Sequence, residues 1–222
     1  MTNLEGAIVL VVGASGGLGS RIAIQLEGAG ATVVRGSRNG SVDGPAEDLR
    51  EPSAAAALVA ATIAAHGRLD GLVIAAGVVA FGPASEVSDD TLAELFDTNT
   101  LAPIRLIRES FAPLAASASA GSKPFVVTFT GVVAEAPTAG LAAYSAAKSA
   151  LAAYIVAASR EFRRSGIRLM DARPGHVETE LSKHPIAGTS PQFGAGLSPD
   201  AVAARVVKAI VDEEKDLPST AF

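Results

Sequence analysis

Tyr144 and Lys148 stand four positions apart in the Ala-rich stretch YSAAK, residues 144–148. Side chains at i and i+4 of a helix face the same way. A lysine ammonium beside a phenol would favour the phenolate and lower the tyrosine pKa, and a lowered pKa suits proton exchange with a carbonyl or an alcohol near neutral pH. The same spacing also describes an ordinary surface pair, so the rest of the chain has to supply a cofactor site and a substrate pocket.

The glycine-rich stretch GASGGLG, residues 13–19, could supply the cofactor site. It follows a short apolar run and precedes a helical pattern. Gly13, Gly17 and Gly19 would let the backbone turn tightly and let a pyrophosphate approach the helix N-terminus, where free N–H groups and the helix dipole favour anions. This position favours nucleotide binding over a glycine-rich turn without a ligand.

The elements that would position these residues follow from the apolar pattern. Short β-branched runs predict strands at 7–12, 31–36, 69–76, 125–130 and 167–172. Longer Ala-rich stretches predict helices at 17–28, 53–66, 89–116, 141–165 and 199–214. This alternation predicts an α/β, Rossmann-like, doubly wound parallel sheet with helices on both faces, as a single domain over residues 1–222. A mobile substrate loop is expected around 180–198, since Gly, Pro and Ser are frequent there.

Composition narrows the function classes. The chain has 222 residues, a net charge of −5 with scattered basic residues, and no cysteine. Nucleic acid is therefore not an expected partner, and disulfides and thiolate metal sites are excluded. The three histidines lack ligand spacing, so no metal is expected. No signal peptide and no apolar stretch long enough for a bilayer is seen, which favours a cytoplasmic protein without a membrane partner.

Five motifs in order resemble those of the short-chain dehydrogenase/reductase family, over nearly the whole chain. GASGGLG looks like its G-x-x-x-G-x-G turn, and Asn99 lies at its helix asparagine. Tyr144 and Lys148 match its Y-x-x-x-K. The remaining two are IAAG (74–77) at its N-N-A-G and RPGHVET (173–179) at its P-G-x-V-x-T. Together they are specific, whereas each alone is weak.

The resemblance implies a nicotinamide cofactor and its site. The implied cofactor-binding residues are Gly13, Ser15, Gly17, Leu18, Gly19, Ala76, Gly77, Tyr144, Lys148, Pro174, Gly175, Val177 and Thr179. NAD-preferring members commonly have an acid where Ser37 stands. Ser37 followed by Arg38 suits a 2′-phosphate instead, because a guanidinium bonds phosphate in a bidentate way. NADP(H) is thus favoured over NAD(H), the alternative being that Arg38 is a solvated loop residue.

Asp48 and Leu49 resemble the family's D-V pair beside the adenine. An acid favoured by a helix dipole is an equal alternative for Asp48.

The implied activity is hydride transfer between NADP(H) and a carbonyl or secondary alcohol, with Tyr144 as acid and base. In the resemblance Lys148 also holds the nicotinamide ribose, and Asn99 steadies a water linked to Lys148. The substrate pocket is expected between residues 79–88, 131–143 and 182–197. The long helices are expected to pair between subunits, which predicts a homodimer or homotetramer.

Several positions depart from the family pattern. Val12 replaces a threonine, and Ile74 and Ala75 replace both asparagines of N-N-A-G. Residues 38–48 are too short for the family's usual helix and strand, so an abbreviated third unit is expected, with a short strand around Ala46–Leu49.

The catalytic serine of the family falls on Gly131, which has no hydroxyl. Thr130 is its neighbour, and the conformational freedom of glycine could turn Thr130 toward the substrate. We therefore take Thr130 as the candidate replacement, with a water as the alternative. The missing serine also keeps two rival functions open: a nucleotide-binding regulatory or interaction protein with impaired turnover, and a reductase of another C=N or C=C substrate.

Overall fold

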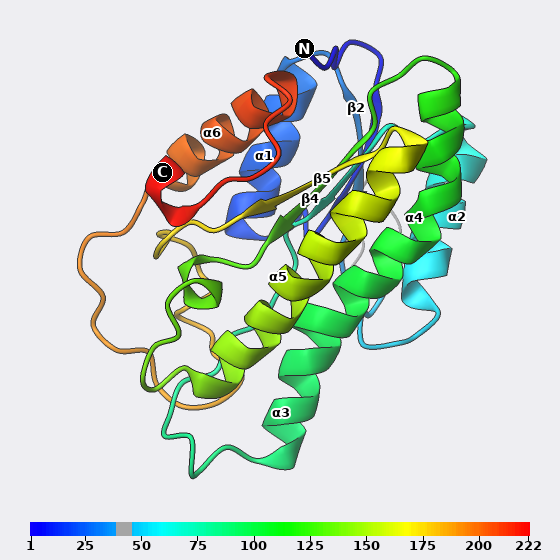
Figure 1. The fold of residues 1–222 in the computed structure, drawn as a ribbon. Coiled ribbons are helices and arrows are strands. Elements are labelled where there is room, and N and C mark those ends of the chain that lie inside the picture. The colour runs from blue at the N-terminus through cyan, green and yellow to red at the C-terminus, as the bar shows by residue number, and fades with distance from the viewer. Residues whose placement is uncertain (39–45) are drawn as a thin grey trace.

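The computed structural model describes residues 1–38 and 46–222 (Figure 1). Its centre is a parallel five-stranded sheet with the strand order β2-β1-β3-β4-β5. The strands are β1 (Ile8–Val12), β2 (Thr32–Gly36), β3 (Gly71–Ile74), β4 (Phe125–Phe129) and β5 (Arg168–Ala172). The predicted α/β doubly wound fold is confirmed.

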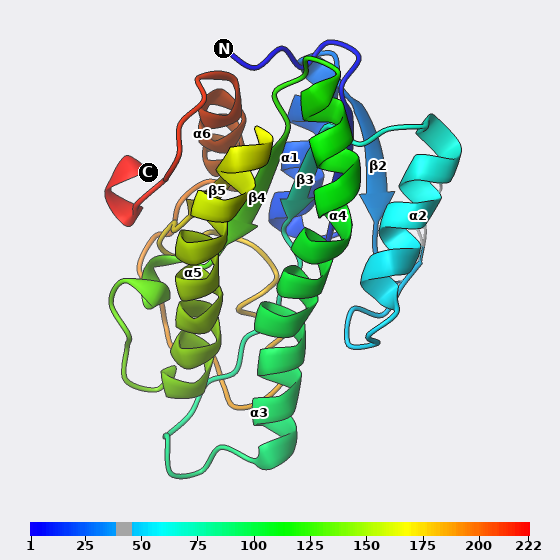
Figure 2. The ribbon, with the colours of Figure 1, turned by 45° about the vertical axis from the view of Figure 1, so that its right-hand side comes forward.

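Both faces of the sheet are buried, as the unbroken apolar strands predicted. All five residues of β1, IVLVV, are buried, and alternate residues enter two separate cores. One core packs α1 (Gly17–Gly28) and α6 (Pro199–Val211) on one face. The other core packs α2 (Ala54–His66), α4 (Ala102–Ser119) and α5 (Ala142–Phe162) on the opposite face (Figures 1 and 2).

The helix predicted over 89–116 is interrupted. It consists of α3 (Asp89–Phe96), a π-helical turn over Asp97–Leu101, and α4. Pro103, in the first turn of α4, has no N–H to donate to the carbonyl of Asn99, so a regular α-helix would lose a bond here. Single π-turns are frequent at functional sites, and this one contains Asn99.

The short strand expected around Ala46–Leu49, after β2, does not form in full. Ser37 forms an isolated parallel bridge with Ala46. The strand expected around Ala46–Leu49 is reduced to this bridge, because the chain turns at Leu49 and buries its side chain in the core. The rest of the expected short unit, residues 39–45, lies outside the described residues.

The loop after β5 is tied to the body at several points. Ala187 bridges Ala80, and Leu197 bridges Val177. The ring of Phe193 stacks on His176 at a centroid distance of 4.2 Å. The mobility expected for residues 180–198 stays a prediction. Within the described chain, no helix has the length and apolarity needed to cross a bilayer.

Candidate active site

The glycine-rich turn joins β1 to α1 at the carboxyl end of the sheet. Gly13 has φ +85°, and a Cβ on it would lie 2.5 Å from the backbone nitrogen of Ala76. A Cβ on Gly19 would lie 2.2 Å from the carbonyl oxygen of Gly13. Both distances are far below any contact, so only glycine permits this close approach of backbone to backbone. The turn therefore packs against the backbone of Ala75 and Ala76.

The first turn of α1 is open to a ligand. Its N-cap is Gly16, which offers no side-chain cap, and Ser15 is exposed. Leu18 is half-buried against the core. A Cβ on Gly17 would lie 3.0 Å from the Thr179 side chain. The uncapped N–H groups and the nearby Thr179 make a cradle that suits an anionic group.

Ser37 and Arg38 lie at the end of β2. Ser37 is buried, and its hydroxyl has no hydrogen-bond partner within the described chain. Such a buried orphan is uncommon, and a ligand is one way to satisfy it. Arg38 is exposed. The pair can thus present one hydroxyl and one guanidinium at this edge.

Asp48 and Leu49 are held differently. The guanidinium of Arg50 donates to the Asp48 carboxylate at 2.5 Å, and hydrogen bonds from Arg50 lower the pKa of Asp48 to about 2. Leu49 is 8% exposed and belongs to the core. Asp48 is therefore paired with Arg50 in this structure, and Leu49 contributes to the core whether or not a ligand is bound.

Asn99, Lys148 and Gly77 meet at the end of β3. Asn99 is fully buried; its Nδ2 donates to the carbonyl of Val78 at 2.9 Å, and the Val78 N–H donates back to Oδ1 at 3.1 Å. A Cβ on Gly77 would lie 2.9 Å from Asn99 Oδ1 and 3.6 Å from Lys148 Nζ. The π-turn and α5 thus deliver two polar side chains to one point.

Tyr144 and Lys148 lie on the buried side of α5. Lys148 Nζ donates to the carbonyl of Phe129 at 2.7 Å and lies 5.7 Å from the Tyr144 ring centroid. Burial lowers the pKa of Lys148 to about 8, although the negative charge of Asp171 opposes this. Burial raises the pKa of Tyr144 to about 12. The predicted lowering of the Tyr144 pKa is therefore wrong for this state, because burial outweighs an ammonium that is bonded elsewhere.

Thr130 points to a buried carboxylate. Its hydroxyl donates to Asp171 Oδ2 at 2.5 Å, and Thr128 donates to Oδ1 at 2.8 Å. Arg173 Nη1 donates to the same Oδ2 at 3.2 Å. Asp171 is 3% exposed, and burial raises its pKa. Thr130 is therefore not turned toward a substrate, contrary to our expectation. The buried Asp171 carboxylate needs hydrogen-bond donors, and the Thr130 hydroxyl is one of them.

Gly131 adopts a backbone conformation that excludes other residues. Its φ is +75° and its ψ is 168°, a region that is essentially restricted to glycine. A Cβ there would meet only the carbonyl oxygen of Pro174, at an ordinary 3.6 Å. Strain, not space, therefore opposes a serine at this position.

The segment after β5 completes the site. Pro174 is buried, and its carbonyl accepts the N–H of Val132 at 2.9 Å. Gly175 follows, and Val177 is held by its bridge to Leu197. Together with Thr179 near Gly17, this segment runs from the end of β4 to the glycine-rich turn.

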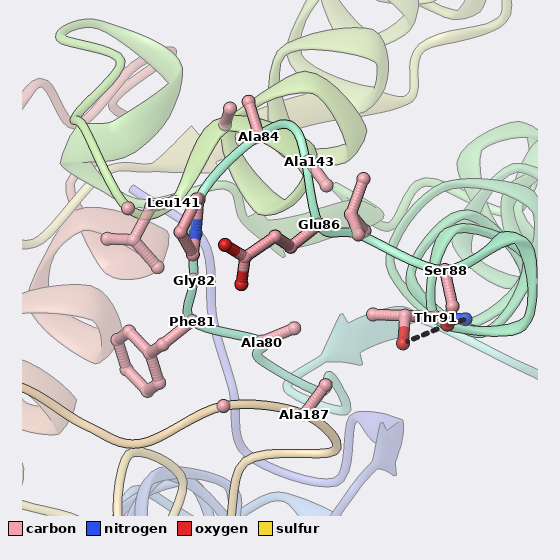
Figure 3. A pocket seen from close by; sticks show the side chains of 15 residues that line it. Ala80, Phe81, Gly82, Ala84, Glu86, Ser88, Thr91, Leu141, Ala143 and Ala187 are labelled. Atoms are coloured by element: carbon pink, nitrogen blue, oxygen red, sulfur yellow. Dashed lines mark hydrogen bonds between the residues drawn. The ribbon is translucent and has the colours of Figure 1, made fainter.

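A cavity of about 280 Å³ is lined by residues that include Ala80, Ala143 and Ala187 (Figure 3). Its lining comes from residues 80–84, 86–88, 91, 140–143 and 187–188, and all of these except Thr91 fall in the three segments expected to bound the pocket. Ala143 directly precedes Tyr144, and Ala80 and Ala187 pack in one cluster with its ring. The Tyr144 ring therefore packs against residues that form part of the cavity wall.

Sequence reasoning missed two acidic residues near the candidate site, Glu86 at the cavity and Asp171 beside Thr130. Glu86 lines the cavity and lies within a predicted pocket segment, but nothing in its local pattern marks it. Asp171 is the one acid in the strand IRLMDA, residues 167–172. An acid in an otherwise apolar buried strand is a signal that could have been used.

Known proteins resemble this chain in sequence and in fold. Residues 7–188 match the family described as short chain dehydrogenase. An uncharacterized oxidoreductase of Methylorubrum extorquens is 31% identical over 89% of this chain and 83% of its own. The cyclic-di-GMP-binding biofilm dispersal mediator protein of Escherichia coli is 32% identical over 82% of this chain and 78% of its own.

A solved structure shares the fold at lower identity. A 3-ketoacyl-(acyl-carrier-protein) reductase from Brucella melitensis, complexed with NADH, has a TM-score of 0.87 at 21% identity, over 98% of this chain and 99% of its own. The family match spans most of the chain. The chain belongs to the short-chain dehydrogenase family of oxidoreductases.

Proposed function

We propose that this oxidoreductase transfers a hydride between NADP(H) and a carbonyl or secondary alcohol, with Tyr144 exchanging the proton. In the reducing direction, a ketone or aldehyde, NADPH and one proton give the alcohol and NADP⁺. The observation that carries the proposal is the meeting of Gly77, Asn99 and Lys148 at one strand end. The Tyr144 ring lies 5.7 Å from Lys148 Nζ and packs in one cluster with Ala80 and Ala187 of the cavity wall.

The residues present suit a dinucleotide. Gly13 and Gly19 leave room for close backbone approach, and the uncapped start of α1 suits a pyrophosphate. The orphaned hydroxyl of Ser37 and the guanidinium of Arg38 suit a ribose 2′-phosphate, which is why NADP(H) is favoured. Pro174, Gly175, Val177 and Thr179 would hold the nicotinamide end. The bound nicotinamide would supply the hydride, and the protein supplies position and a proton.

Tyr144 is suited to give a proton. With a pKa of about 12, its phenol stays protonated at neutral pH. It can therefore donate to a carbonyl oxygen that gains negative charge, and the nearby Lys148 ammonium stabilises the phenolate that results. Asn99 is locked by Val78 and fixes the strand end next to Lys148. The carbonyl oxygen of Phe129 holds Lys148 in place.

Gly131 stands where the family has its serine, so the second donor to the substrate oxygen is missing from the side chains. Since Thr130 is bonded to Asp171, we favour a water molecule as that donor.

The proposal also includes a homodimer or homotetramer. Leu101, Phe111 and Val156, on or next to α4 and α5, are large apolar residues that remain exposed in the single chain.

The test is reduction of a panel of ketones and aldehydes by the parent protein and by Tyr144→Phe. The phenylalanine keeps the ring but has no proton to transfer, so turnover should fall by about 10²–10⁴-fold, the usual contribution of general acid catalysis. Binding of NADPH, followed by fluorescence, should be unchanged. If Tyr144→Phe reduces any good substrate at the parental rate, Tyr144 is not the acid.

A second candidate is a nucleotide-binding regulatory protein without turnover. It is supported by the missing hydroxyl at Gly131 and by the Escherichia coli relative, whose name describes a cyclic-di-GMP-binding mediator. The same panel separates the two functions: tight nucleotide binding with no turnover of any carbonyl would favour the regulatory protein.

A further inference from the structure

Glu86 gives the cavity beside Tyr144 its charge. Among the described residues that line this cavity, Glu86 is the one ionisable side chain. Most of the other lining residues are alanine, glycine or larger apolar residues. The hydroxyls of Ser88 and Thr91 are hydrogen-bonded to each other at 2.9 Å (Figure 3). An apolar pocket with one acidic group selects by charge as well as by shape.

The backbone around Glu86 is held in place. Its N–H donates to the carbonyl of Pro83 at 3.1 Å, and the N–H of Gly82 donates to the carbonyl of Gly140 at 2.9 Å. The third segment of the lining is equally close, because a Cβ on Gly188 would lie 1.8 Å from the Phe81 carbonyl oxygen. From this turn the side chain of Glu86 extends between the loops, toward Gly82 (Figure 3). The contacts above therefore fix the backbone from which the Glu86 side chain extends.

The carboxylate of Glu86 has no partner of its own. Within the described chain, neither a hydrogen bond nor an ion pair engages it. Lys183, on the neighbouring loop, is paired with Glu180 at 2.7 Å. Glu86 is exposed, so solvent weakens its pairing with a cation, but its carboxylate is available to any cation that enters the cavity. The same negative charge repels a carboxylate or phosphate.

We propose that the cavity takes a carbonyl compound with a cationic group, such as a primary ammonium, at the end remote from the reacting carbon. Glu86 pairs with that cation, while the apolar walls cover the middle of the molecule and the carbonyl reaches Tyr144. The position of the carbonyl rests on the proposed function. The charge preference rests on the cavity alone and can be measured without any turnover.

Three matched ketones test the preference: 4-(aminomethyl)-, 4-(hydroxymethyl)- and 4-(carboxymethyl)acetophenone. They differ in charge at one end, and the methylene group insulates the carbonyl from that difference. Calorimetry in the presence of NADP⁺, with which a ketone does not react, measures binding alone. We expect the ammonium ketone to bind roughly tenfold more tightly than the carboxylate ketone, with the neutral one between them, since an exposed ion pair contributes up to about fivefold.

Glu86→Gln keeps the shape and removes the charge, so the three affinities should come within about twofold of one another. Asp90→Asn is the matched control, because Asp90 is an exposed acid nearby that does not line the cavity. It should keep the order of the parent. The inference is overturned if none of the ketones binds, if the carboxylate ketone binds best, or if Glu86→Gln leaves the order intact.

Turnover of the same ketones with NADPH separates this inference from the proposed function. Reduction in the order ammonium, neutral, carboxylate supports both. Charge-selective binding without reduction of any ketone would contradict the proposed activity and leave the cation site standing. Reduction of all three ketones at equal kcat/KM would support the proposed activity and contradict the inference that Glu86 selects substrates by charge.

Discussion

At the glycine-rich turn, Gly13 and Gly19 have no space for a Cβ, whereas two of the three glycines that line the cavity, Gly82 and Gly140, have open space for one. A Cβ at Gly13 or Gly19 would collide with main-chain atoms. At the cavity, one bond from Gly82 to Gly140 links two loops, and Phe81 faces Phe193 at 6.0 Å. The cofactor side is therefore set by close backbone packing at both glycines, whereas at the cavity such packing is confined to Gly188 and the other loop contacts are ones that substitution can change.

A substitution at Gly19 is the most direct test of this difference between the two sides. Gly19→Ala places a methyl group 2.2 Å from the Gly13 carbonyl oxygen, so the turn must shift. We expect the free energy of unfolding to fall by about 3 kcal/mol, the upper end of overpacking costs, and NADPH binding to be lost. Urea denaturation and fluorescence titration measure the two effects.

Gly28→Ala is the matched control on the same helix. A Cβ on Gly28 meets nothing within 4 Å, and alanine is the better helix former. This variant should be as stable as the parent or up to about 1 kcal/mol more stable, with unchanged NADPH affinity. Equal behaviour of the two variants would mean that close approach at Gly19 is not what shapes the turn.

The same difference explains what could be predicted from the sequence. The strands, most helices and the glycine-rich turn follow from local rules of burial, periodicity and backbone sterics, which a linear motif records. The π-turn does not, because Asn99 is held by Val78 at the end of a distant strand. Pro103 was a local hint of the break, but hydrogen bonds across the fold fix where it falls.

The surroundings of Thr130 could not be predicted either. Thr128 and Asp171 are paired across β4 and β5, and the sequence does not state this register. The pairing places a buried carboxylate where it takes the Thr130 hydroxyl. The pKa shift of Tyr144 could not be predicted either, since whether the pKa is raised or lowered depends on how deeply the side chain is buried. The spacing of Tyr144 and Lys148 carries no such information.

On the cofactor side, Arg38 is the proposed contact to the 2′-phosphate, and this contact depends on the charge of its side chain. Arg38→Ala should weaken NADPH binding by about tenfold and leave NADH binding unchanged, because a charge-assisted contact to the 2′-phosphate is lost. Fluorescence titration of both cofactors measures this. Arg164→Ala, an exposed arginine just after α5, is the control and should change neither affinity. A parallel loss for NADPH and NADH would remove the 2′-phosphate as the partner of Arg38.

The last prediction concerns pH and lies between the two sides, at Lys148. Burial lowers the pKa of Lys148 to about 8, so its ammonium is present below pH 8 and lost above it. Tyr144, with a pKa of about 12, stays protonated over this range. If the ammonium stabilises the phenolate as proton transfer proceeds, kcat/KM for carbonyl reduction should be constant below about pH 8 and fall above it.

Asp171 identifies the charge behind this profile. Its carboxylate raises the pKa of Lys148 against the effect of burial, so Asp171→Asn should move the fall in kcat/KM to lower pH while reducing activity at pH 6 only a few-fold. Thr128→Val removes a hydrogen bond to the same carboxylate and keeps its charge, so its midpoint should match the parent. A loss of packing alone would affect both variants alike and leave both midpoints in place. An acidic shift confined to Asp171→Asn would therefore assign the effect to charge, transmitted from a buried acid that touches neither substrate nor cofactor.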